Sequence, residues 1–336
     1  LSFLVWLNAS QGIDPLFWKK LYDDAAASND IVVVAEVAKH LSVNDTALSS
    51  SLWHRAVQLW EQGSSIYSVL TVLEQQKDID TSIRKRFINR LAGADAPGLG
   101  YQVAKIACLQ AEVDPREALR TLSRTQDGFL DEGKIIETIV QHVNIANEAD
   151  VEDWLEQEEG NTLLKEETRT QFRVALLRRA VNEGLVASTR LIRRIADAEK
   201  RFRLLIQFAV RVGSTEGSDL LEEVKRELEN TGATALKSYL YELLGNAFLS
   251  FDWREALQCY KTALDEAMQA DNGVVFHDDI MCIVKTCFSA PSEFARNLSG
   301  YAMEVITRFP YDRDPFVTPE TCKFDCILLC ALAMKA

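Results

Sequence analysis

The sequence predicts an all-α protein whose helices pack in successive antiparallel pairs. Apolar residues recur at spacings of three and four, as in Phe202, Leu205, Ile206, Ala209 and Val212, and this spacing places them on one face of a helix. The chain has 336 residues but only 15 Gly and 7 Pro, which favours long helices over a turn-rich β architecture. Connections between the expected helices are mostly short, and short connections force sequential neighbours to pack antiparallel.

Local signals mark where the helices begin and end. Pro stands near a first helical position, where its missing N–H is tolerated, at Asp14-Pro15, Asp114-Pro115, Ala290-Pro291 and Thr318-Pro319. Asp114 is also followed three residues later by Glu117, as in a capping box. Glycines mark the expected ends, at Gly63, Gly93, Gly160, Gly184, Gly213 and Gly232.

These signals divide the chain into eighteen expected helices. In chain order they cover 14–27, 29–41, 45–62, 65–77, 80–92, 98–112, 115–125, 129–147, 150–158, 162–183, 187–196, 198–212, 217–230, 234–250, 253–270, 274–289, 291–308 and 318–335. The run Ile31 to Val34 is the one stretch that could form a strand, but its flanking residues favour a buried helix. Two helices per unit give a repeat of about 35 to 40 residues, which is the signature of an α-solenoid.

No Pro/Ser-rich linker divides the chain, so we expect one continuous solenoid. A chain of this length would ordinarily form more than one compact domain, but in a solenoid each repeat buries its apolar face against its neighbours. We expect N-terminal helical repeats over 1–92, central repeats over 93–230 and C-terminal repeats over 231–336.

One segment, residues 239–267, resembles a tetratricopeptide repeat. Leu244-Gly245 and Phe248 stand where the first helix of that repeat has Leu-Gly and an aromatic residue. The second helix has its small, aromatic and small residues at Ala256, Tyr260 and Ala263. The span between the two helices is one residue shorter than usual, and the terminal Pro is absent.

The resemblance implies a right-handed superhelix with a concave surface, lined by first helices, that holds a peptide or a partner's helix. This is an analogy at the level of the fold, and fold alone does not dictate function. Another helical repeat, such as a HEAT-like one, and a compact helical domain remain as alternatives.

Composition limits the classes of partner and the compartment. A formal net charge of -13 and a pI of about 4.9 argue against nonspecific nucleic-acid binding. The number of Cys is seven, which is odd, and they stand at helical spacings, so we expect no disulfide framework and a reducing compartment, cytoplasmic or nuclear. The apolar run Leu1 to Leu7 is too short to span a membrane, and no membrane association is expected.

No complete catalytic signature occurs, so we expect no enzyme activity, no cofactor and no metal. His277-Asp278-Asp279 could ligate a metal in a helical hydrolase, but the acids suit the first turn of a helix. Cys322, Cys326 and Cys330 form one helical stripe, whose outer members lie about 12 Å apart, too far to surround one ion. A Gly-x-Ser-x-Gly elbow and a phosphate-binding glycine loop are both absent from the sequence.

Charge is distributed unevenly along the chain. Residues 148–167 hold nine carboxylates and one Lys, whereas residues 169–211 hold eleven cations and three carboxylates. Arg grips carboxylates and phosphates with two parallel bonds, so the basic stretch predicts a docking site for an acidic or phosphorylated peptide. The candidate residues are Arg178, Arg179, Arg190, Arg193, Arg194, Lys200 and Arg201. The alternative is internal compensation, in which the acidic stretch lies against the basic one, or else both stretches are solvated faces.

These observations predict a non-catalytic scaffold that binds a peptide or a partner protein in a helical-repeat groove, within a multi-protein complex. The alternative is a regulatory or sensor region of a larger enzyme or signalling protein. That alternative is suggested because the chain begins without Met and stops inside a helical pattern, at Leu328 to Ala336.

Overall fold

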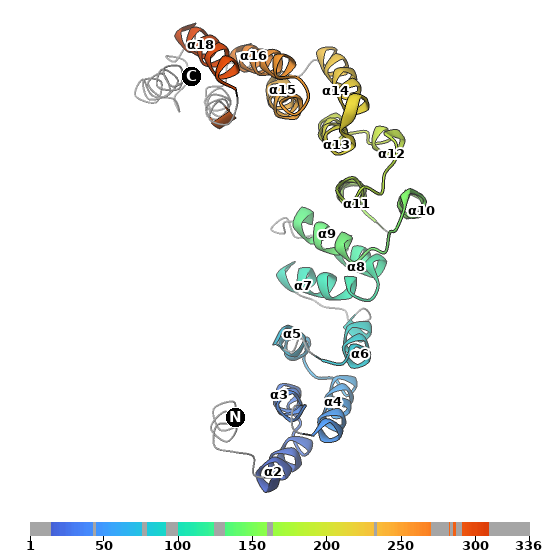
Figure 1. Ribbon diagram of the computed structural model, residues 1–336. Helices are drawn as coiled ribbons and strands as arrows, with labels where there is room; N and C mark the ends of the chain where they lie inside the picture. The colour runs from blue at the N-terminus through green and yellow to red at the C-terminus, as the bar shows by residue number, and fades with distance from the viewer. Residues whose placement is uncertain are drawn as a thin grey trace. The chain divides into compact units, whose positions relative to one another are not determined.

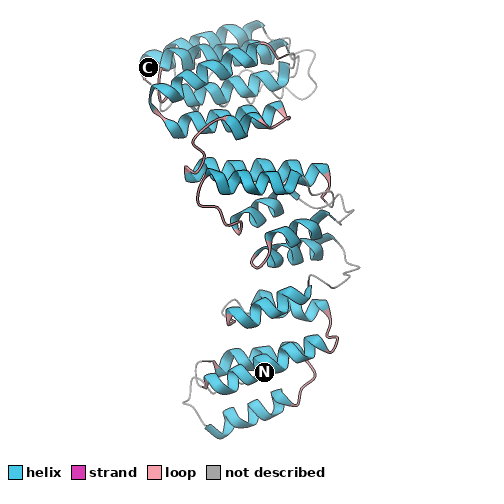
Figure 2. Cartoon of the chain, turned by 90° about the vertical axis from the view of Figure 1, so that its right-hand side faces the viewer, coloured by secondary structure: helices cyan, strands magenta, loops and turns pink. Residues whose placement is uncertain are grey.

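The computed structural model describes residues 15–42, 45–75, 79–91, 100–123, 132–159, 164–231, 234–269, 282, 285–286 and 291–308. Every regular element in these ranges is an α-helix, and no strand occurs in them (Figure 2). This confirms the all-α class, including the Val-rich run, which lies in a helix that begins at Ile31. None of the helices within the described ranges is long and apolar enough to cross a membrane.

The chain divides into two compact units, Leu1–Asn144 with Trp154–Ala175, and Ile145–Asp153 with Leu176–Ala336. The first unit holds α2 (Pro15–Ala26), α3 (Ile31–Leu41), α4 (Thr46–Glu61), α5 (Ile66–Gln75), α6 (Thr81–Leu91), α7 (Gly100–Ala111), α8 (Pro115–Ser123) and α9 (Glu132–Gln141). The boundary between the units passes through α10 (Glu148–Glu159) and α11 (Glu166–Glu183).

Side-chain caps explain where several helices of the first unit begin. The Asp30 carboxylate accepts the Val32 N–H at 2.9 Å, and the Asp45 carboxylate accepts the N–H of Ala47 at 3.0 Å. Asp114 does the same ahead of α8, where it accepts the Arg116 N–H at 2.9 Å. Each such bond satisfies one of the amides that a helix leaves unpaired at its first turn.

Helices of the first unit pack against their neighbours and their next neighbours in the chain. Thus α3 packs against α4 and α5, while α4 also packs against α6. Figure 1 shows α3 next to α5 in one row, and α4 next to α6 in a second row alongside it. Their apolar faces form one buried cluster, in which Val34, Ala38, Leu41, Leu52 and Phe87 are fully buried.

The second unit continues with α12 (Arg190–Arg193), α13 (Ala198–Val212), α14 (Ser214–Glu229), α15 (Thr234–Phe248), α16 (Trp253–Gln269) and α18 (Ser292–Arg308). Here α13 packs against α14 and α15, α15 packs against α16, and α16 packs against α18 (Figure 1). Phe202, Leu205, Phe248, Tyr260 and Phe294 are among its buried side chains.

Helix boundaries differ from the expected ones by three residues or more at α9, α11, α12 and α14. α9 ends at Gln141, and the Asn147 side chain accepts the Asp150 N–H at 3.1 Å at the start of α10. α11 begins at Glu166 and not at 162. α12 covers only Arg190–Arg193 of the expected 187–196. α14 follows Gly213 directly, since this glycine has φ 65° and turns the chain in one residue.

Candidate protein-binding surfaces

The seven cations proposed from the sequence lie on three helices of the second unit and the turns beside them. Arg178 and Arg179 belong to α11, and Arg178 is half-buried. Arg190, Arg193 and Arg194 lie on or next to α12, and Lys200 and Arg201 belong to the first turn of α13.

Arg190 and Arg194 share one carboxylate of the acidic stretch. The Glu152 oxygens of α10 lie 2.6 Å from an Arg190 nitrogen and 3.7 Å from an Arg194 nitrogen. One turn earlier on the same helix, the Glu148 carboxylate accepts the Ala187 N–H at 2.9 Å. The acidic helix is therefore fixed to the segment that leads into α12.

Arg193 faces a different helix. Its guanidinium lies 2.9 Å from Glu223 and 2.7 Å from Glu227 of α14, and the hydrogen bond to Glu227 is the main cause of its raised pKa. Arg193 therefore contacts other carboxylates than Arg190 and Arg194, which both contact Glu152.

The other predicted cations also contact groups of their own neighbourhood. The Arg179 Nε lies 2.7 Å from Glu183, and the Lys200 ammonium lies 3.3 Å from Asp197. Arg201 donates to the Ile195 carbonyl at 2.7 Å. These partners lie outside the acidic stretch 148–167, whereas Arg190 and Arg194 contact Glu152 within it, as the alternative of internal compensation expects. A docking role for the seven cations stays a prediction.

The segment similar to a tetratricopeptide repeat forms the α15–α16 pair. Gly245 lies against the Tyr260 ring so closely that a Cβ at this position would stand 2.9 Å from a ring carbon. The Tyr260 hydroxyl donates to the Asn246 side-chain oxygen at 2.8 Å. Ala256 and Phe248 are fully buried. The motif residues thus occupy the contact between the two helices, as close helix packing requires of small residues facing an aromatic one.

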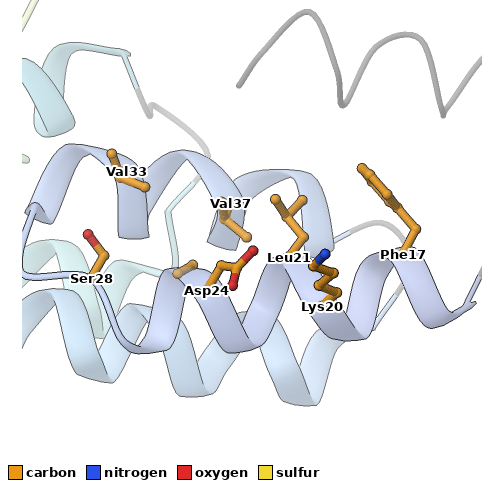
Figure 3. A pocket seen from close by; sticks show the side chains of 8 residues that line it. Phe17, Lys20, Leu21, Asp24, Ser28, Val33 and Val37 are labelled. Carbon is orange, nitrogen blue, oxygen red and sulfur yellow. The ribbon is translucent and has the colours of Figure 1, made fainter.

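A cavity of about 490 Å³ opens between α2 and α3 (Figure 3). Its walls are mainly apolar and include Phe17, Leu21 and Val37, with Lys20 and Asp24 among the polar residues that line it. These residues lie in the expected helices 14–27 and 29–41, but a cavity was not predicted, because residue spacing indicates which face is apolar and not how fully that face is covered.

A second basic region lies on α6 and was not predicted from the sequence. This helix carries Arg84, Lys85, Arg86 and Arg90 and no acidic residue. A count of charges by helix would have found it. The prediction was based instead on the longer run at 169–211, in which several cations lie beside carboxylates, as Arg190 and Arg193 do.

The remaining candidate chemistry lies largely outside the described ranges, as do His277-Asp278-Asp279 and the stripe of Cys322, Cys326 and Cys330. Among the described residues, no group of three or more His, Cys, Asp or Glu side chains could hold a metal ion. Cys108, Cys259 and Cys282 are free thiols. Burial raises the pKa of Cys282 to about 12, and its thiol donates to a Glu242 oxygen at 2.8 Å.

No family model matches the chain, and a search of curated proteins finds no relative.

Proposed function

We propose that the chain is a non-catalytic scaffold, an α-solenoid of tetratricopeptide-like antiparallel helix pairs, that binds a peptide or a partner protein. The observation that carries this proposal is the packing of consecutive helices joined by short connections. The α15–α16 pair is its best example, because Gly245 admits the Tyr260 ring between two helices joined by only four residues. Stacked helix pairs form extended surfaces, and proteins of this architecture use such surfaces for binding.

Internal packing supports a binding role over a catalytic one. Within the described residues, the side chains with strongly shifted pKa values are thiols and phenols, whose pKa is raised by burial, as at Cys259 and Tyr241. A raised pKa makes a thiol a poorer nucleophile at neutral pH, because the thiolate is the reactive form. These groups therefore suit a structural role.

Selection of peptides from a random display library against the immobilised full chain tests the proposal. We expect recurrent peptides that bind the folded chain saturably, with dissociation constants below about 100 µM, or about -5.5 kcal/mol of binding free energy. Scrambled versions of the same peptides serve as the control. If no sequence is enriched, or if scrambled peptides bind equally well, the scaffold proposal is wrong.

A further inference from the structure

The exposed face of α6 carries an excess of positive charge. Ile83, Phe87, Ile88 and Leu91 bury one side of the helix. The opposite side presents Lys85, Arg86, Asn89 and Arg90, which are all exposed and include no acidic residue. We call these four residues the α6 basic face. It lies on a chain whose net charge is -13.

Within the part of the chain that the structure describes, carboxylates only partly neutralise the positive charge of this helix. Arg84, at the edge of the buried side, is fully matched, because its Nε and one terminal nitrogen contact the two Glu112 oxygens at 2.6 and 2.7 Å. Glu61 of α4 is the only carboxylate that pairs with the basic face among the described residues, at 3.2 Å from Arg86.

Arg90 does not use that carboxylate. It donates instead to the Glu61 backbone carbonyl at 2.8 Å, and its guanidinium lies 5.7 Å from the centre of the Trp60 ring. Lys85 makes no ion pair with any described residue. Among the described residues, one carboxylate therefore pairs with a face of three exposed cations, whereas Arg193 alone contacts two carboxylates.

We infer that the α6 basic face binds an acidic segment of a partner protein. The inference rests on the proposed scaffold function and names the chemistry of one partner. Arg86 and Arg90 are four residues apart, so their attachment points lie about 5–6 Å apart along the helix. Two carboxylates one helical turn apart, or two residues apart on an extended strand, match this spacing. Each guanidinium can donate two parallel hydrogen bonds to a carboxylate.

A partner protein fits this face better than a nucleic acid does. Affinity for nucleic acid grows with the number of phosphates that the protein neutralises, and this face offers three cations on a strongly acidic chain. A short acidic segment of a protein needs only two or three ion pairs with this face, in addition to contacts elsewhere on the surface.

The chain offers a matched control for the test. Lys19 on α2 and Lys39 on α3 are also two exposed cations on helices of the first unit, and neither lines the cavity. The variants K85E/R86E and K19E/K39E therefore change the net charge by the same amount. Both substitutions leave the buried faces unchanged, and far-UV circular dichroism and thermal unfolding check that both variants fold.

The probe is a fluorescent helical peptide with Glu at every fourth position and Ala between, compared with the same peptide carrying Gln. At an ionic strength of about 0.05 M, where screening is weak, we expect the full chain to prefer the Glu peptide. K85E/R86E lowers this affinity at least about tenfold, or 1.4 kcal/mol, whereas K19E/K39E changes it less than about threefold. Zero-length carbodiimide coupling joins the peptide to Lys85 in preference to Lys19 and Lys39.

Equal losses in the two variants, or equal coupling at all three lysines, would show a general charge effect and overturn the inference. Displacement of the peptide by an oligonucleotide of equal charge at lower concentration would assign the face to nucleic acid instead. If display selects peptides that bind K85E/R86E unchanged while the Glu peptide shows no preference, the scaffold function stands and this inference alone fails.

Discussion

Gly245 is the residue whose replacement gives the most direct test of the α15–α16 contact. A Cβ there would stand 2.9 Å from a carbon of Tyr260, whose ring is fully buried and whose hydroxyl is bonded to Asn246 and, at 3.3 Å, to Thr286. The ring cannot move without breaking these bonds. We expect Gly245→Ala to lower the free energy of unfolding by about 1–3 kcal/mol, as overpacking does.

Gly300 is the matched control for this substitution, since it also lies within a helix of the second unit. Nothing stands within 4 Å of a Cβ at this position. Gly300→Ala should therefore raise the free energy of unfolding by about 0.5–1 kcal/mol, because Ala loses less conformational freedom in a helix. Urea titration measures both variants, and shifts of the same sign would contradict the packing described for Gly245.

Cys259 gives a prediction that depends on pH. Burial raises the pKa of this thiol from an ordinary 9.0 to about 12, against the opposing effect of the nearby Lys225 ammonium. Below pH 9 the thiol is protonated in both the folded and unfolded chain, so it has no effect on pH dependence. Between about pH 9 and 12 only the unfolded thiol ionises, so folding stability falls as the pH rises.

We expect iodoacetamide to leave Cys259 of the native chain unmodified up to about pH 10, since only the thiolate reacts. Mass spectrometry of the modified peptides measures this, with urea-unfolded chain as the control. Cys259→Ala should remove part of the loss of stability above pH 9. Rapid labelling of native Cys259 at pH 8 would show that the thiol is neither buried nor protonated as described.

The residue types in the sequence predicted which side chains pack between helices better than they predicted which charged side chains form ion pairs. The pattern similar to a tetratricopeptide repeat marked Gly245 and Ala256 as small positions and Tyr260 as an aromatic one, because residue size and spacing decide which residues fit between helices. The basic stretch was proposed as a surface because composition counts charges without locating them. Whether Arg193 faces solvent or two carboxylates of α14 depends on a contact thirty residues away along the chain, which spacing within one helix does not record.

At the scale of elements, α12 is a short helix that depends on its neighbours. Its four residues follow Thr189, which makes no side-chain capping bond, and so few residues cannot form a stable helix alone. Leu191 and Ile192 are fully buried, and its flanking arginines contact Glu152. α12 is therefore stabilised by packing and ion pairs with its neighbours. Because the local sequence does not record these contacts, the helix predicted from it was longer than the one found.

We expect Glu152→Gln to accelerate amide hydrogen exchange in residues 187–196 and to cost at most about 1 kcal/mol of overall stability, because the pairs are partly exposed. Adding salt to about 1 M should produce a similar change in the unaltered chain by screening the same pairs. Glu183→Gln, which breaks only a pair within α11, is the control. Unchanged exchange in Glu152→Gln would show that burial alone holds α12.

At the scale of the whole molecule, the helical class followed from periodicity and from the scarcity of breakers, and the structure confirms it. The division into compact units did not follow, because the boundary passes through α10 and α11, where no Pro, Ser or Gly-rich linker marks it. The three expected sections and the solenoid itself stay predictions. A solenoid has a property that a compact domain lacks, which is that each repeat is stabilised only by its neighbours.

Phe87→Ala in α6 tests that property. The Phe87 side chain is fully buried, and its removal should cost about 3–5 kcal/mol locally. In a solenoid, faster hydrogen exchange should spread to the helices that contact α6, namely α4, α5 and α7, and leave α15 and α16 protected. Phe248→Ala in α15, an equally buried Phe, should give the reverse pattern, with α13, α14 and α16 affected. If either substitution removes protection uniformly along the chain, the molecule unfolds as one compact body and the solenoid proposal fails.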